Sequence, residues 1–127
     1  MERRFWIGLG GAAGTLARHG LSVWCQQRFG TAFPHGTLAV NVIGSFLLGA
    51  IMQAAMTTDL ISPTLRLALG TGLMGGFTTY SSFNYETLKL LHDDAWALGA
   101  LNVVATLLGR LLAGLLGMGA ARRLLAG

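Results

Sequence analysis

The fold is decided by the stretch GGFTTYSSF, residues Gly75 to Phe83, which lies inside a strongly apolar segment. Two adjacent glycines weaken a helix. The hydroxyl side chains that follow them can form hydrogen bonds with backbone groups that lose their helical partners. In hydrocarbon, irregular backbone persists only where protein buries it or where it lines a watery cavity. The stretch therefore predicts a membrane helix that is broken near the bilayer midplane, with carbonyls and hydroxyls facing something polar.

The composition predicts a small integral membrane protein. Of the 127 residues, 53% are hydrophobic and 11% are charged, whereas about 25% are charged in ordinary soluble domains. Four spans of about 20 residues each would occupy most of the chain. We therefore expect an all-α, single membrane domain over residues 1–127, with spans at about 5–24, 36–56, 64–92 (broken at 75–83) and 95–121.

The charges point toward lipid and anions as partners. The net charge is +4, but the basic residues are scattered or terminal and form no stripe, so lipid headgroups or an anionic solute are expected rather than nucleic acid. An even number of spans places both termini on one side, and the Lys/Arg bias favours the cytoplasm for that side. It carries Arg3, Arg4, Arg66, Arg122 and Arg123, against Arg28 and Lys89 on the other side.

The first span is expected to remain uncleaved and to pack closely. Met1–Arg4 followed by an apolar run resembles the opening of a signal peptide, but no soluble domain follows it. Gly10 and Gly14 are four residues apart, which places small residues on one helix face for close packing. Arg18 lies well inside this span. Such a residue faces a bundle interior or a watery cavity, or its side chain snorkels to the interface, and the sequence leaves both open.

Polar residues of the other spans allow two interpretations each. Asn41 either forms a helix–helix hydrogen bond or offers its amide donors to an anion. Tyr80 and Phe83 are three residues apart, so they either pack in a core or line a pore among the neighbouring hydroxyls. Arg110 shares a helix face with Thr106. It either binds an anion or pairs with Glu86, and the sequence does not separate these roles.

These residues resemble the Fluc (CrcB) fluoride channels. GGFTTYSSF is similar to the GGxTTFSTF signature of that family. The resemblance extends to the first span, from Gly10-Gly11 to Arg18, and to the GTLxVN run at Gly36 to Asn41 in the second span. Together the motifs cover four spans and nearly the whole chain, in the order and spacing of the family.

The resemblance implies an antiparallel dual-topology dimer, inserted in both orientations, with two fluoride pathways. Its broken third helices would cross at the dimer centre, where backbone carbonyls hold a structural sodium ion. Carried over to this sequence, those carbonyls belong to Gly75 and Thr78. The residues expected to line the fluoride pathway are Asn41, Tyr80, Phe83, Thr79, Ser81, Ser82 and Arg18, with Arg110 as the further candidate.

The resemblance also implies a passive, fluoride-selective channel in a bacterial plasma (inner) membrane, crossing it several times and lowering cytoplasmic fluoride. Fluoride is small and tightly hydrated, so a pore must replace lost water with hydrogen-bond donors that hold the ion weakly enough to release it. Aromatic rings carry a positive edge along which an anion can pass. Tyr80 departs from the family's usual Phe, and Arg110 lies where the fourth helix usually offers a hydroxyl. The partner is a second copy or an oppositely oriented paralogue.

Two other functions compete with this interpretation. A small multidrug exporter has a similar size and topology, but cation exchange would need a carboxylate embedded in the first span, where Arg18 is the embedded charge. A membrane assembly subunit without transport activity would explain the small-residue packing but not the hydroxyl run beside aromatics. An enzyme is not expected, because the sequence shows no nucleophile–base pair, metal cluster or phosphate loop.

Overall fold

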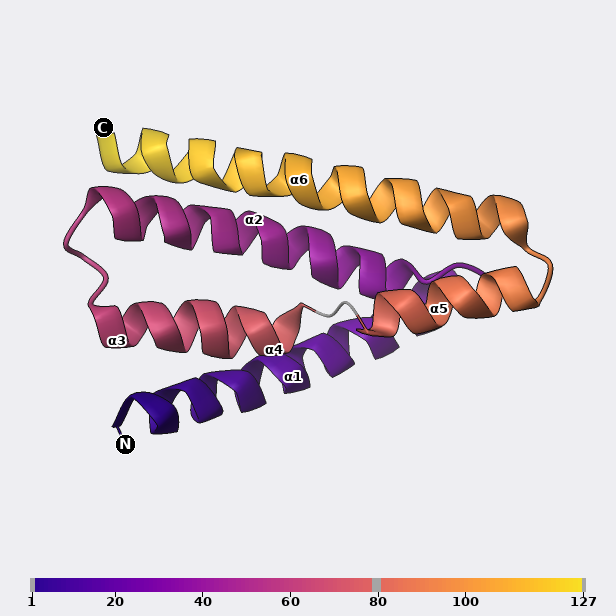
Figure 1. Cartoon of the computed structure of the whole chain (residues 1–127), viewed down its shortest axis with the longest axis horizontal. Helices are drawn as coiled ribbons and strands as arrows, with labels where there is room; N and C mark the ends of the chain where they lie inside the picture. Colours follow the sequence, from indigo (N-terminus) through magenta and orange to yellow (C-terminus); the bar gives the residue numbers. More distant parts are fainter. Residues whose placement is uncertain (1, 79–80, 127) are drawn as a thin grey trace.

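The computed structural model describes residues 2–78 and 81–126, and every regular element in these ranges is helical. In Figure 1, α1, α2, the row formed by α3 to α5, and α6 run the length of the molecule in alternating directions, with both termini at one end. The all-α class expected from the sequence is confirmed. The elements are α1 (Glu2–Phe29), α2 (His35–Thr57), α3 (Pro63–Arg66), the π-helix η1 (Leu67–Met74), α4 (Gly75–Phe77), α5 (Ser81–His92) and α6 (Trp96–Ala126).

The third row begins with a capped turn and continues as a wide helix. The hydroxyl of Ser62 accepts a hydrogen bond from the backbone N–H of Leu65 at 3.1 Å, which caps α3 in the usual N-terminal manner. The segment η1 then has π-helical geometry, and the N–H of Gly75 bonds back to the carbonyl of Gly70. This π-helical geometry was not predicted from the sequence. A π-helix is rare, and short π segments are frequent at functional sites.

The glycine pair belongs to the helix that precedes the interruption. Gly75 has right-handed helical angles, φ −63° and ψ −38°, and α4 continues to Phe77. Regular helix ends at Thr78, whose ψ of 152° is extended, and α5 begins at Ser81. The interruption thus starts later than the expected boundary at residue 75. Thr79 and Tyr80 lie outside the described residues.

Close helix contact explains why glycine occupies these positions. A Cβ atom on Gly10 would lie 2.9 Å from the backbone nitrogen of Leu73, and one on Gly72 would lie 2.7 Å from the carbonyl oxygen of Ile7. A Cβ on Gly14 would collide with the carbonyl oxygen of Leu73, and one on Gly76 with that of Gly11. The small-residue face expected on the first span is therefore confirmed, and it packs on η1 and α4.

Replacing Gly14 with alanine is expected to destabilise the protein by about 1–3 kcal/mol, the usual cost of overpacking. The added methyl group meets backbone atoms of Leu73 and Phe77, which cannot rotate away as a flexible side chain would. Gly20→Ala in the same helix is the matched control, since no described atom lies within 4 Å of its Cβ position. Thermal unfolding in detergent measures both variants, and equal unfolding temperatures would contradict this packing.

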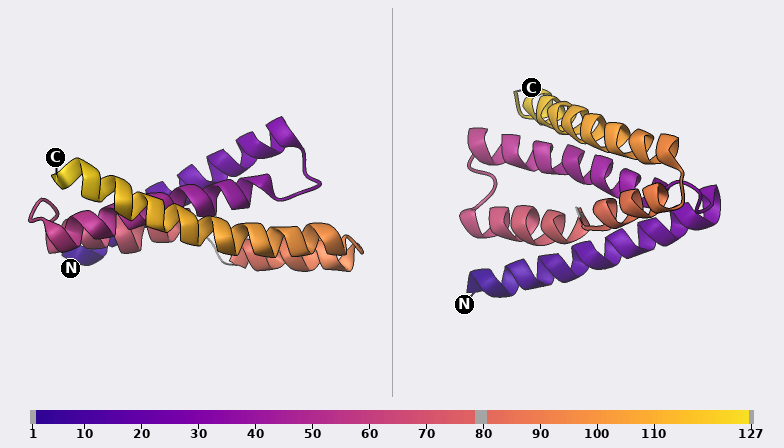
Figure 2. Two further views of the ribbon diagram at one scale, coloured as in Figure 1. Left: turned by 90° about the horizontal axis from the view of Figure 1, so that it is seen from above. Right: turned by 45° about the vertical axis from the view of Figure 1, so that its right-hand side comes forward.

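Helices α2 and α6 lie against each other and run in the same direction (Figures 1 and 2). Their backbones approach closely at glycines. A Cβ on Gly49 would collide with the carbonyl oxygen of Gly114, and a Cβ on Gly117 would collide with that of Phe46. This pair of helices forms one side of the molecule, and its close contact fixes which residues of α2 face which residues of α6.

The described residues bury polar side chains and expose large apolar ones, the reverse of the distribution in a soluble domain. The largest fully buried side chains of the described residues are Val40, Asn41, Asn102 and Thr106, three of them polar, whereas Leu111 on α6 is 68% exposed. Buried polar side chains and exposed leucines are typical of helices that lie in lipid.

Among the described helices, α2 and α6 are long and apolar enough to cross a membrane, judged by length and composition. Each has a mean hydropathy of 1.8 over its most apolar window. Helix α1 contains four arginines, at positions 3, 4, 18 and 28, which lower its mean hydropathy. The third row is divided among several shorter helical elements.

Candidate functional site

Two polar stripes run along the facing sides of α2 and α6. Residues four apart lie on one helix face. On α2 the residues with this spacing are Thr37, Asn41 and Ser45. On α6 they are Asn102, Thr106 and Arg110. We call these six residues the polar ladder. Thr37, Asn41, Asn102 and Thr106 are buried, so the ladder lies inside the molecule for most of its length.

The parallel register of α2 and α6 brings the two stripes level. The Nε–H of Arg110 donates to the hydroxyl of Ser45 at 3.4 Å. The same offset of 65 residues relates Ser45 to Arg110 and Gly49 to Gly114, which are in contact one turn further along. Applied to the preceding turns, this register places Asn41 level with Thr106. Each turn of the ladder therefore pairs two polar residues.

Helix α5 is tied to both stripes by side-chain hydrogen bonds. The amide of Asn102 donates to the hydroxyl of Thr87 at 2.8 Å, and the hydroxyl of Thr106 donates to Asn102 Oδ1 at 3.5 Å. On the other stripe, the hydroxyl of Thr37 donates to Glu86 Oε1 at 2.7 Å. The second carboxylate oxygen of Glu86 is buried and accepts no hydrogen bond from the described residues. These bonds hold α5 against the outer end of the ladder.

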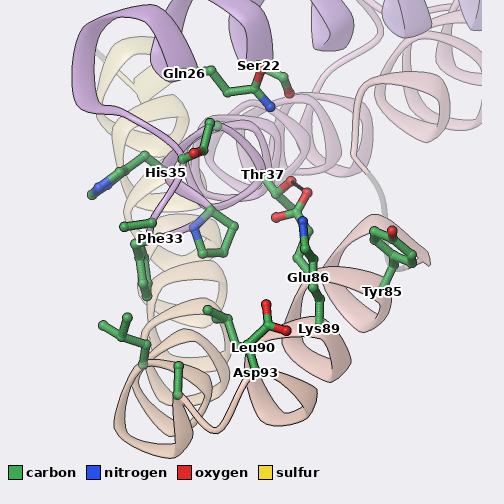
Figure 3. Close-up of a pocket in the computed structure, with 16 residues that line it drawn as sticks. Ser22, Gln26, Phe33, His35, Thr37, Tyr85, Glu86, Lys89, Leu90 and Asp93 are labelled. Atoms are coloured by element: carbon green, nitrogen blue, oxygen red, sulfur yellow. Dashed lines mark hydrogen bonds between the residues drawn. The ribbon is translucent and has the colours of Figure 1, made fainter.

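A cavity of about 510 Å³ adjoins this end of the ladder. It lies where the end of α1, the α1–α2 connection and the α5–α6 turn meet, and Figure 3 shows Thr37 and Glu86 together at its wall. Its other polar lining residues include Ser22, Gln26 and Lys89. Thr37 therefore belongs both to the cavity wall and to the ladder, one helical turn from the fully buried Asn41.

Two of the residues expected to line the pathway lie in the first turn of α5. Phe83 lies in the first turn of α5 and is buried, with 7% of its surface exposed, and Ser82 beside it is half-buried. Asn41 is fully buried on α2. Thr79 and Tyr80 lie outside the described residues, and Ser81 begins α5 without a described side chain.

Arg18 reaches from α1 to the end of α4. Its Nε–H donates to the carbonyl oxygen of Gly76 at 3.2 Å, so this part of the guanidinium lies at the interruption of the third row. The interruption is also held from α2, because a Cβ on Gly44 would collide with the methyl group of Thr78. The positive charge of Arg18 thus lies beside carbonyls that the helix releases.

The carbonyls proposed to hold sodium have suitable chemistry. The hydroxyl of Thr78 donates to the carbonyl of Met74 at 2.9 Å, while the extended ψ of Thr78 turns its own carbonyl out of the helical hydrogen-bond ladder. Gly75 lies three residues earlier, in the last turn of helix, where carbonyls lack the usual partners. Neutral carbonyl oxygens are the ligands with which channels hold alkali cations, so the donor set fits the ion.

Sequence reasoning missed Thr37 and Asn102 as parts of the site. The signal was present, because each lies four residues before a polar residue that was singled out, Asn41 or Thr106. Of the two roles left open for Arg110, pairing with Glu86 does not occur. In the part of the chain that the structure describes, Glu86 accepts from Thr37 and Arg110 donates to Ser45.

Comparisons with known proteins agree on one family. Residues 5–118 match the family model described as CrcB-like protein, Camphor Resistance (CrcB). The chain is 72% identical, over all 127 residues and the full length of both chains, to a fluoride-specific ion channel FluC of Sorangium cellulosum. It is 52% identical over 113 residues to a protein of the same name from Anaeromyxobacter dehalogenans, covering 89% of this chain and 90% of the relative. A further FluC, from Geobacter sulfurreducens, is 50% identical over 118 residues, which cover 93% of this chain and 95% of the relative.

Proposed function

Because this chain belongs to the CrcB-like family, we propose that it is a passive, fluoride-selective ion channel that lets fluoride leave the cytoplasm and so lowers its toxicity. The observation that carries this function is the identity of 72% over the full length of a fluoride-specific ion channel. The protein is therefore a membrane transport protein and not an enzyme.

Buried hydrogen-bond donors support the proposed pathway. Fluoride loses hydration water on entering a narrow pore, and donors must replace that water. The buried amide of Asn41 and the hydroxyl of Ser82 supply such donors, and the ring of Phe83 supplies an edge of positive character. We place Thr79, Tyr80 and Ser81 on the same pathway, because they complete the motif to which Ser82 and Phe83 belong. Arg18 contributes positive charge beside the interruption.

A structural sodium ion would be held by the carbonyl oxygens of Gly75 and Thr78. When bound, it supplies positive charge to carbonyls that have left the helical ladder, and a buried carbonyl without a partner is costly. The third row is then a membrane helix broken near the bilayer midplane. The hydrogen bond from Arg18 to Gly76 braces the same interruption from α1.

The functional unit is proposed to be an antiparallel, dual-topology dimer in the bacterial inner membrane, with each copy crossing the membrane several times. Family resemblance supports this arrangement, and the apolar helices α2 and α6 support the membrane location. The Lys/Arg difference between the two sides is three, which is a small bias for orientation. A pairing with an oppositely oriented paralogue is the alternative to the homodimer.

Fluoride efflux from liposomes that contain the purified protein tests this function. A potassium ionophore clamps the voltage, and a fluoride electrode records the release. We expect rapid fluoride efflux, with chloride retained in parallel vesicles. A folded protein that releases no fluoride would exclude the homodimeric channel, and continued silence after adding the paralogue would exclude the channel function altogether.

A further inference from the structure

Both ends of α1 carry an exposed tryptophan beside arginine. Figure 1 shows these two ends of the helix at opposite ends of the molecule. We call the residues at the start of α1 the start cluster, which is Arg3, Arg4 and Trp6. The end cluster is Trp24 and Arg28. All of these residues are exposed, and none of them is expected to line the fluoride pathway.

In each cluster the indole is held in place but is not covered by the chain. The ring of Trp6 packs edge to face on Phe5 with centroids 5.2 Å apart, and the ring of Trp24 does so on Phe29 at 6.1 Å. The guanidinium carbon of Arg28 lies 6.0 Å from the centroid of the Trp24 ring, at the usual limit of a cation–π contact. Trp24 nevertheless remains 53% exposed and Trp6 40%. Packing within the single chain therefore leaves both indoles available to another partner.

The two tryptophans are separated by about the thickness of a bilayer core. Trp6 and Trp24 are 18 residues apart, which is about five turns of an α-helix and about 27 Å along its axis. They therefore lie on the same side of α1, and Ala13 and Ala17 between them on that side are apolar and exposed. The hydrocarbon core of a bilayer is about 30 Å thick, and tryptophan is enriched at both of its interfaces with water. The spacing thus favours one cluster at each interface.

The charge of each cluster suits an anionic headgroup. Glu2 offsets one of the two arginines at the start of α1, so the side chains of residues 2–6 carry a net charge of +1, and so do those of residues 24–29. No further carboxylate occurs in α1. Arginine binds phosphate oxygens through parallel N–H bonds, and basic residues close to a membrane surface attract anionic lipids. Each end of α1 therefore combines a phosphate-binding group with an interfacial aromatic ring.

We propose that the start cluster and the end cluster of α1 are binding sites for the headgroups of anionic phospholipids, one site in each leaflet. In each site the guanidinium binds the lipid phosphate, and the indole, apolar in its rings and polar at its N–H, lies beside the headgroup. Because the two sites use the same residue types and carry the same net charge, α1 meets the two leaflets alike in either direction of insertion. This inference goes beyond the proposed channel, since it requires the membrane location but not fluoride conduction.

Contact quenching of tryptophan fluorescence tests each site separately. The chain has three tryptophans, so Trp6→Phe with Trp96→Phe leaves Trp24 as the reporter, and Trp24→Phe with Trp96→Phe leaves Trp6. Each full-length variant is reconstituted in phosphatidylcholine vesicles that contain brominated phosphatidylglycerol or, in parallel, the same share of brominated phosphatidylcholine. We expect the anionic lipid to bind beside each tryptophan about fivefold more tightly, which is the factor for one net positive charge near an anionic surface.

Two arginine variants serve as controls for each other. Arg28→Gln brings the net charge of the end cluster to zero, and it is expected to abolish the preference for the anionic lipid at Trp24 while leaving the preference at Trp6 unchanged. Arg3→Gln brings residues 2–6 to a net charge of zero, and the opposite pattern is expected. A preference that either variant lowers equally at both tryptophans would reflect the charge of the whole chain and would contradict two separate sites.

Two further results would overturn the proposal. One is equal quenching by the two lipids at both tryptophans with every arginine in place, a comparison that does not depend on the folding of an arginine variant. The other is quenching by neither lipid, which would show that another protein surface, such as a second copy, covers the clusters. Fluoride efflux from the same vesicles separates this proposal from the channel. Lipid preference without efflux would contradict the channel and keep the sites, whereas efflux without lipid preference would contradict the sites alone.

Discussion

Replacing Asn41 with aspartate is expected to reduce fluoride efflux at least about 100-fold, because two like charges 4 Å apart repel by ~4 kcal/mol at an effective dielectric constant of 20. Asn41 is fully buried, so water screens a carboxylate at this position poorly. The substitution also removes the amide donors and leaves only acceptors, which a fluoride ion cannot use. Efflux from liposomes measures the loss, and the elution volume in detergent reports whether the proposed dimer is intact.

Gln27→Glu is the matched control for this variant. It makes the same change from amide to carboxylate on an exposed residue near the end of α1, away from the ladder. We expect its efflux to equal that of the unmodified chain. Comparable efflux from Asn41→Asp and Gln27→Glu, in protein that remains folded, would remove Asn41 from the pathway.

Replacing Phe83 with isoleucine is expected to lower fluoride efflux by about tenfold, which corresponds to ~1.4 kcal/mol, because the substitution removes the positive ring edge that the ion would pass. Isoleucine keeps an apolar side chain at this buried position, where 7% of Phe83 is exposed, but it has no ring edge of positive character. The same liposome assay measures the change.

Phe5→Ile is the control for loss of an aromatic ring, because Phe5 is 62% exposed near the start of α1. It is expected to conduct normally. If Phe83→Ile conducts as well as Phe5→Ile, the ring edge makes no contribution to permeation, and Phe83 is then a packing residue of α5.

The helical class and the close packing of α1 were predictable, because both follow from local features of the sequence. Composition limits a chain with 11% charged residues to an environment that is largely apolar. Glycines four residues apart share a helix face whatever lies opposite them. Helix α1 extends beyond the expected span of 5–24 to Glu2–Phe29, since a helix can continue through polar residues outside the apolar core of the span.

The position of the interruption was predicted less well, for a physical reason. Adjacent glycines destabilise an isolated helix, which suggested that the break begins at Gly75. In the folded chain, Gly76 instead allows α4 to approach the backbone of α1 at Gly11, and Gly75 stays helical. Tertiary contact thus overrides the local preference, and the π-helix η1 just before it is another consequence of packing that the sequence pattern does not show.

The pairing of the two stripes of the polar ladder could be found only from the structure. The four-residue spacing within each stripe is visible in the sequence, but the pairing of Ser45 with Arg110 depends on α2 and α6 running in the same direction with a fixed offset. No local feature of either helix predicts the register between them. For the same reason the sequence could not decide whether Arg110 binds an anion or pairs with Glu86. The structure excludes the pairing, because Glu86 accepts a hydrogen bond from Thr37.

Current across a planar bilayer containing only this purified chain tests the central claim most directly. A fluoride gradient is imposed while chloride is equal on the two sides, and the reversal potential is read from the current–voltage relation. A passive fluoride-selective channel predicts a steady current that reverses at the fluoride equilibrium potential. A reversal at zero voltage, or a flux that persists against the fluoride gradient, would contradict a passive fluoride-selective pore.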